Sequence, residues 1–211
     1  MARGLSRFAL YTMAFLSVAI ALHALRFWAV PANIWLQIDD GIRGVIQRVP
    51  VQALTHMLIA PIALLIGPFQ FIARIRQRRP ALHRTMGKIY VAACLLAGLG
   101  ALATAPYASG GPIAGLGFGT LAVLWLATTL GAWRAAVQRK FELHRLLMRF
   151  SYAMTFGAVT LRLQIPLFAM MGYATYPQAS VWLAYTSWIP NVIAVALYSM
   201  WEALDRPAAA K

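Results

Sequence analysis

Two arginines and two histidines lie within segments that are apolar enough to cross a membrane. They are Arg26, Arg162, His23 and His56, and no carboxylate lies deep in the same segments. An arginine at the middle of a membrane helix costs at least about 2.5–3.5 kcal/mol, so its presence indicates a functional site by default. The sequence therefore predicts a polar chamber within the membrane region, in which other groups compensate these charges.

The four histidines of the chain fall into two layers when depth is counted at about 1.5 Å per helical residue. His23 and His56 are level in the outer half, whereas His83 and His144 are level at the cytoplasmic ends of their segments. His83 and His144 also stand in similar Leu-His-Arg contexts, which indicates a short internal repeat. Helical bundles build cofactor sites from side chains at matching depth on facing helices. The layers therefore predict cofactor sites between helices.

Imidazole is the commonest protein ligand of metal ions and an axial ligand of haem, and guanidinium pairs well with carboxylates such as haem propionates. The predicted cofactor is therefore a haem b or a transition metal, with a chain that carries no cofactor as the alternative. An interfacial hydrogen bond is the competing explanation for any single histidine near a helix end. The candidate metal ligands are His56, His83 and His144, and the wider cofactor-binding set adds His23, Arg149 and Arg162.

Further polar side chains extend the predicted chamber in the outer half. Arg162 would pair with Asp39 or with an anionic group of a cofactor or substrate. Nearby prolines each free a helical carbonyl, and irregular backbone persists at membrane depth only where protein or a cavity satisfies it. The prolines are Pro61, Pro166 and Pro190, and the polar cavity residues are Arg26, Arg162, Gln164, Asn191 and Asp39.

The elements that position these residues are membrane helices. Of 211 residues, 61% are hydrophobic and 11% are charged, and apolar runs of spanning length recur along the chain, which is typical of a polytopic membrane protein. We predict an all-α fold in one domain, 1–211, with a short interfacial helix in the outer segment 31–48. The six predicted spans are approximately 8–30, 50–73, 86–107, 112–133, 149–171 and 181–203.

Charge predicts how this bundle lies in the membrane. The net charge is +14, and most Lys and Arg residues lie in the loops after the second and fourth spans or near the chain ends. The positive-inside rule then places both termini in the cytoplasm, with the protein in the bacterial inner membrane. Anionic lipid headgroups are the expected partners of the cytoplasmic face, and a nucleic-acid partner is not predicted.

Some chemistries are excluded. The single Cys94 provides neither a disulfide framework nor a thiolate metal site within one chain. The sequence contains no HExxH, carboxylate-pair or Glu-x-x-His motif, which argues against a zinc protease or a di-iron carboxylate centre. No catalytic residue is assigned.

Short motifs in a specific combined spacing carry a resemblance. They include His56 followed by Gly67-Pro68-Phe69-Gln70-Phe71, Arg79-Pro80 with Leu82-His83-Arg84, Gly110-Gly111-Pro112, His144-Arg145 with Met148-Arg149, Thr160-Leu161-Arg162-Leu163, and Trp188-Ile189-Pro190-Asn191. Over roughly residues 50–195 the chain resembles the bacterial membrane-protein family catalogued as domain of unknown function 2306. The resemblance implies a multi-helix membrane protein and no particular reaction. It supports as recurrent features His56, His83, His144, Arg149, Arg162 and Asn191.

Three functions are compatible with these residues. The first is a membrane protein that binds haem b or a metal for electron transfer or the handling of a respiratory cofactor, which would make it a membrane oxidoreductase with a redox partner. The second is a cofactor-free transporter or channel for a small anionic solute, for which a homodimer would supply the missing size. The third is a membrane assembly or interaction protein without chemistry.

Overall fold

The computed structural model describes residues 2–29 and 40–205, and this part of the chain is helical with no strand. Six of its helical stretches are long and apolar enough to cross a membrane, which confirms the predicted all-α polytopic fold. The helices are α1 (Ala2–Ala29), α3 (Asp40–Arg48), α4 (Pro50–Gln70), α5 (Ala73–Arg78), α6 (Pro80–Thr104), η1 (Ala105–Tyr107), α7 (Gly111–Val137), α8 (Phe141–Met170), α9 (Tyr176–Thr186) and α10 (Ile189–Leu204).

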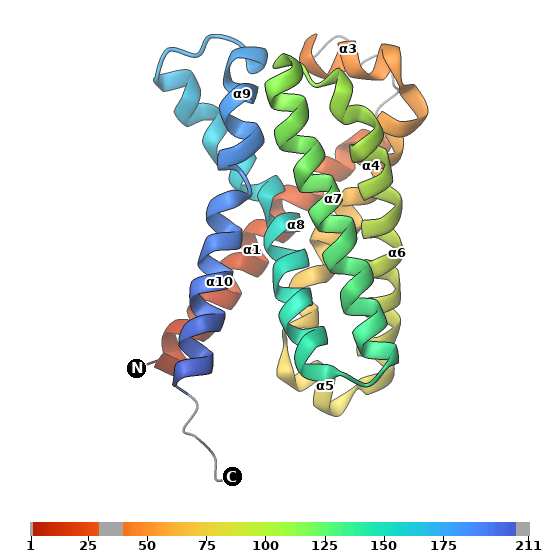
Figure 1. The fold of residues 1–211 in the computed structure, drawn as a ribbon, viewed down its shortest axis with the longest axis vertical. Helices are drawn as coiled ribbons and strands as arrows, with labels where there is room; N and C mark the ends of the chain where they lie inside the picture. Colours follow the sequence, from red (N-terminus) through yellow and green to blue (C-terminus); the bar gives the residue numbers. More distant parts are fainter. Residues whose placement is uncertain (1, 30–39, 206–211) are drawn as a thin grey trace.

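Helices α4, α6, α7 and α8 run along the long axis of the molecule, with α3 and α9 at one end and α5 at the other (Figure 1). Helix α1 crosses behind this group and packs mainly on α4. Because α6 and α8 both run from the α5 end towards the α3 end, residues in their first turns lie at the same end of the bundle.

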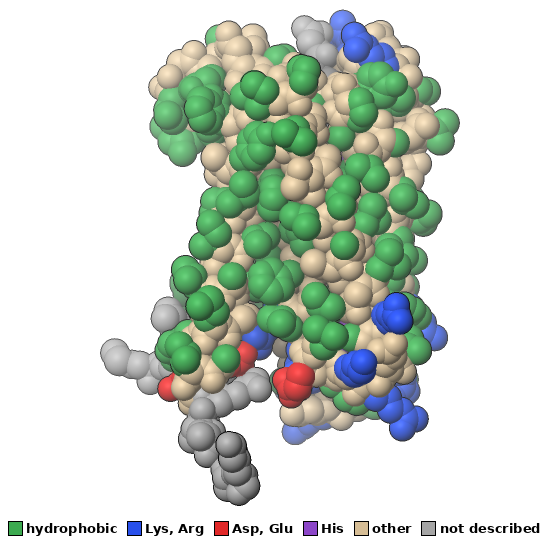
Figure 2. All heavy atoms as spheres, viewed as in Figure 1, with side chains coloured by type: hydrophobic (Ala, Val, Ile, Leu, Met, Phe, Trp, Pro, Cys, Tyr) green, Lys and Arg blue, Asp and Glu red, His purple; other side chains and the backbone are tan. Residues whose placement is uncertain are grey.

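The surface of the bundle has the side chains expected of a membrane protein. Hydrophobic side chains cover the flank of the bundle, while Lys and Arg gather at the end that carries α5 (Figure 2). We call this the basic end and the opposite one the α3 end. Apolar side chains that would be costly to expose to water, such as Leu99, Leu116 and Leu197, are exposed along the flank. A lipid environment removes that cost.

Two helices begin earlier than the hydrophobic runs predict. Helix α6 starts at Pro80 and α8 at Phe141, rather than near residues 86 and 149. Pro80 occupies the first turn of α6, where its missing N–H and fixed φ favour a helix start. Both helices extend beyond the apolar region into basic sequence. The end of a hydrophobic run does not by itself end a helix. His83 and His144 therefore each stand one turn inside a helix.

The last predicted span, 181–203, is two helices. Helix α9 ends at Thr186, α10 begins at Ile189, and Pro190 occupies the first turn of α10. Pro190 cannot donate the hydrogen bond that would continue α9. Among the interfacial residues 31–48, the structure describes α3, and residues 31–39 lie outside the described part.

A cluster of buried hydroxyl groups joins α6, α7 and α8 at the middle of the bundle. The Tyr90 hydroxyl lies 3.0 Å from both Ser151 Oγ and Thr155 Oγ1. Thr129 Oγ1 lies 2.7 Å from Ser151 Oγ, and Trp125 Nε1 donates to Thr155 Oγ1 at 2.9 Å. Every one of these polar groups is buried and bonded, so the cluster fixes the register of three helices without leaving an orphaned donor.

Candidate functional site

A cavity of about 350 Å³ lies between this hydroxyl cluster and the α3 end. Its size falls within the range of about 300–1,000 Å³ that is common for ligand sites. Trp125 and Thr155 line its inner part, and Val45 and Ile46 of α3 line its outer part. Helix α3 therefore contributes to the cavity wall.

The cavity exists because small residues line much of its wall. Met57 and Pro61 also line the cavity. Pro61 has no N–H group, so the Met57 carbonyl lacks its usual helical donor. The remaining wall is mainly apolar and includes the aromatic side chains of Phe118 and Trp125. The small lining residues are Ala24, Ala53, Ala60, Ala101, Ala105, Ala108, Ala122, Gly157 and Ala158.

His56 is the imidazole of this cavity. Its Nδ1 lies 3.0 Å from the carbonyl oxygen of Ala97 on α6. Because a carbonyl oxygen only accepts hydrogen bonds, this contact places the proton on Nδ1 and leaves the lone pair on Nε2. No other hydrogen bond to the ring is made by the residues that the structure describes. The imidazole is therefore oriented by one nitrogen and available for ligation through the other.

Gly100 on α6 allows α4 to approach closely enough for this contact. A Cβ atom at Gly100 would lie 2.7 Å from the carbonyl oxygen of Gln52 and 3.0 Å from the backbone nitrogen of His56. Both contacts are with backbone atoms, which cannot rotate away. The close approach of α4 and α6 thus holds His56 in position.

Arg162 supplies the positive charge of the same cavity. Its side chain lines the wall and is half-buried, and Nη1 donates to the carbonyl oxygen of Ala158 at 2.9 Å. The guanidinium also interacts electrostatically with His56. A guanidinium carries five N–H donors, of which the bond to Ala158 uses one. Two of the sequence-predicted residues, His56 and Arg162, are therefore brought together.

Gln164 and Asn191, which were predicted to line the chamber, instead bridge the broken last span. Gln164 Nε2 donates to the Thr186 carbonyl at 3.2 Å, which is the carbonyl that Pro190 leaves without a helical donor. Thr186 Oγ1 in turn donates to Gln164 Oε1 at 3.0 Å. Asn191 Nδ2 donates to the Ser187 carbonyl at 3.1 Å. Neither side chain belongs to the described cavity wall.

We expect the change Asn191→Ala to lower the free energy of unfolding by about 1–2 kcal/mol, because it orphans backbone carbonyls at membrane depth. Asn191 Nδ2 also contacts the Ala153 carbonyl at 3.3 Å and Thr160 Oγ1 at 2.9 Å. Reversible unfolding in detergent would measure the change. The lipid-exposed Ile193→Ala is the matched control on α10, and equal stability of both variants would contradict the structural role of Asn191.

The other predicted outer residues lie apart from the cavity or outside the described part. His23 is exposed on α1 and is not part of the described cavity wall. Asp39 and the side chain of Arg26 are outside the described residues. The predicted pairing of Asp39 with Arg162 remains a prediction.

His83 and His144 lie at the same level of the basic end. Tyr90 on α6 bonds to Ser151 on α8, and each histidine precedes one of these residues by seven positions, or two helical turns. Residues two turns apart lie on the same helix face, and the two imidazoles interact electrostatically. His144 Nδ1 lies 2.9 Å from the Ala132 carbonyl, the same arrangement that orients His56.

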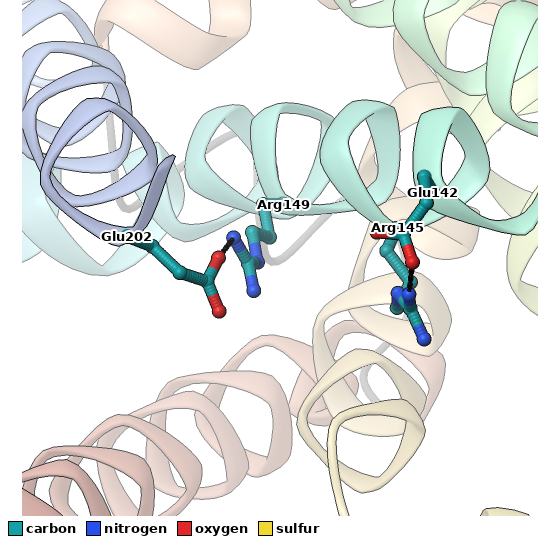
Figure 3. Close-up of polar contacts among 4 residues, drawn as sticks. All are labelled: Glu142, Arg145, Arg149 and Glu202. Carbon is teal, nitrogen blue, oxygen red and sulfur yellow. Dashed lines mark hydrogen bonds and ion pairs between the residues drawn. The ribbon is translucent and has the colours of Figure 1, made fainter. Parts of the chain in front are cut away.

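Arg149, the remaining predicted cofactor residue, ties α8 to α10. Its Nη1 lies 2.6 Å from Glu202 Oε2 (Figure 3). Its guanidinium lies 5.3 Å from the ring centre of Tyr198. Glu142 and Arg145 form a second ion pair, within the first turns of α8 (Figure 3). Arg149 therefore has a structural contact on α10 and does not line the described cavity.

Three cavity-lining or buried residues are not among the site residues that the sequence predicts. Trp125 and Thr155 form the inner part of the cavity, and Gln70 is buried at the end of α4 with 8% exposure. A neutral hydroxyl or indole group in an apolar segment does not indicate a binding site. A threonine hydroxyl, for example, can bond to the backbone of its own helix. Thr155 does so, donating to the Ser151 carbonyl at 3.0 Å.

Comparison with known proteins identifies the family but no activity. No curated protein and no solved structure matches the chain. The family described as "Predicted membrane protein (DUF2306)" matches residues 53–199, which include His56, both histidines of the basic end and Arg162. The match covers more than half of the chain and agrees with the six apolar helices. The chain therefore belongs to the DUF2306 family of predicted membrane proteins.

Proposed function

We propose that the protein binds a haem b in the cavity, where His56 Nε2 would be the group that holds it. The observation that carries this proposal is the orientation of His56, whose Nδ1 is held by the Ala97 carbonyl while the ring lines a cavity of about 350 Å³. Haem-ligating and metal-ligating histidines commonly donate their other ring N–H to a carbonyl or carboxylate, which fixes the tautomer and raises ligand basicity.

The walls of the cavity suit a flat, mostly apolar cofactor with acidic groups. Many alanines line the wall, and Phe118 and Trp125 offer aromatic surfaces. Arg162 would pair with a propionate, because guanidinium and carboxylate match in charge and geometry. Met57 and Met154 also line the cavity, and either would offer a thioether sulfur to help hold the haem. Haem supplies one-electron redox chemistry when bound.

The proposed setting is the bacterial inner membrane with the basic end in the cytoplasm. This orientation follows from the positive-inside rule and the gathering of Lys and Arg at the basic end. It places both termini in the cytoplasm and the cavity in the half of the bilayer away from the cytoplasm.

An optical spectrum of the full chain tests the proposal. The protein is produced in cells supplied with haem precursor, purified in detergent, and measured oxidised and dithionite-reduced, with pyridine haemochromogen analysis for stoichiometry. We expect a Soret band and reduced α and β bands with about one haem per chain. Absence of absorbance beyond the aromatic band, both as purified and after addition of hemin, would refute haem binding.

The second candidate is a cofactor-free site for an amphipathic organic anion in the same cavity. The position of Arg162 in a mainly apolar wall favours it, because such a wall would bury an apolar body while the guanidinium binds an acidic group. A colourless protein whose thermal stability rises with a fatty acid, but not with the corresponding alcohol, would support this function over haem binding. Broken helices such as the α9 to α10 junction also occur in transporters.

A further inference from the structure

Besides Ser199 Oγ on α10, two buried polar groups, both at the basic end, have no hydrogen-bond partner within the described part of the chain. They are Nε2 of Gln70, at the end of α4, and Nδ1 of His83, in the first turns of α6. Buried polar groups are almost always bonded, and leaving one without a partner costs about 1–3 kcal/mol. Two such groups near each other therefore indicate a partner that is not part of the protein.

Gln70 and His83 lie close to each other at the basic end. The Gln70 side chain packs on α6 at Gly87, where a Cβ atom would lie 3.4 Å from Gln70 Oε1. Gly87 follows His83 by four residues, so both lie on the same face of α6. Gln70 is 8% exposed, so its amide is aimed into protein rather than into solvent. His144 on α8 interacts electrostatically with His83 and lies at the same level.

The electrostatic surroundings select an anion. Helices α6 and α8 both begin at the basic end, and neither N-terminus has a side-chain cap, so their first N–H groups and positive dipole ends lie at this level. Arg76 and Arg84 act electrostatically on His83. The carboxylates Glu142 and Glu202, at the same end, are each paired with an arginine. Gln70 Nε2 is a donor, so the partner that it lacks is an acceptor, such as an oxygen of an anion.

We propose that the basic end holds a binding site for a phosphate group, with Gln70 Nε2 and His83 as its buried donors and Arg76 and Arg84 as its charged partners. Helix N-termini together with arginines are a common way of binding phosphate. The phosphate belongs either to the headgroup of an anionic phospholipid, for which basic pockets between membrane helices are typical sites, or to a free phosphate ion. The site is separate from the cavity and does not depend on the proposed haem.

Thermal unfolding of the full chain, followed by tryptophan fluorescence, tests the site. The protein is titrated in neutral detergent with inorganic phosphate at constant ionic strength, and separately compared in nanodiscs of phosphatidylcholine with and without phosphatidylglycerol. We expect the melting temperature to rise in a saturable way. A rise with both probes shows that the phosphate ion alone is recognised, and a rise with phosphatidylglycerol only assigns the site to a lipid headgroup.

The variant Gln70→Leu is expected to weaken the apparent affinity about tenfold or more. Gln77→Leu is the matched control, because Gln77 is exposed on α5 at the same end and should bind like the unchanged protein. If Gln70→Leu does not fold, Gln70→Glu keeps the shape while replacing the donor with a negative charge. No stabilisation by either probe would overturn the proposal. Equal stabilisation of the Gln70 and Gln77 variants would also overturn it, because it would show only a general attraction of phosphate to the basic end.

Discussion

Purified His56→Ala protein should lack nearly all of the haem absorbance that we predict for the unchanged chain. The imidazole is the oriented ligand of the cavity, held by the Ala97 carbonyl at 3.0 Å. Groups that only orient a ligand already contribute about 10–100-fold in metal affinity, so loss of the ligand itself should lower haem content by more than about tenfold. Pyridine haemochromogen analysis per chain measures the effect directly.

Three controls separate ligation at His56 from general damage. His23→Ala should retain full haem content, because His23 is exposed and outside the described cavity wall. Arg162→Gln should weaken binding about tenfold without abolishing it, since one charge-assisted hydrogen bond contributes about 1.5–3 kcal/mol. Retention of full absorbance by a folded His56→Ala protein would contradict axial ligation by His56. Loss in His144→Ala instead would move the haem to the basic end.

The fold and the position of the cavity could be predicted from the sequence to different degrees. Apolar runs of spanning length predict six membrane helices, because the thickness of the bilayer fixes the length of a spanning helix. Counting residues along those helices also placed His56 and Arg162 in the same half of the bundle. Depth alone does not give the direction of a side chain, which is why His23 was grouped with His56 although it is exposed on α1.

Polar residues beside prolines were the least predictable part of the site. Gln164 and Asn191 have the depth expected of cavity residues, but the break at Pro190 creates backbone carbonyls nearby that bind their amides. Whether such a side chain serves a ligand or its own backbone depends on how neighbouring helices pack, which the sequence does not encode locally. The burial of Gln70 is hard to predict for the same reason, because a glutamine near a loop is ordinarily exposed.

Gly100→Ala is the second variant with a large expected effect, and it acts through the backbone that holds His56. The added methyl group would lie 2.7 Å from the Gln52 carbonyl oxygen and 3.0 Å from the His56 nitrogen, so α4 and α6 must separate. Overpacking of this kind costs about 1–3 kcal/mol. It should also weaken the contact between His56 and the Ala97 carbonyl, so haem content should fall together with stability.

Gly119→Ala on α7 gives the matched comparison for this prediction. Both glycines lie inside membrane helices, so the gain in helix propensity is shared, but at Gly119 the new methyl would lie 3.5 Å from the Ala105 Cβ atom, an ordinary contact. Gly119→Ala should therefore be neutral or up to about 1 kcal/mol more stable. Unfolding in detergent and haem content are measured on both variants. Equal stability of the two would show that α4 and α6 are not closely packed at His56, and the orientation of its imidazole would lose its structural basis.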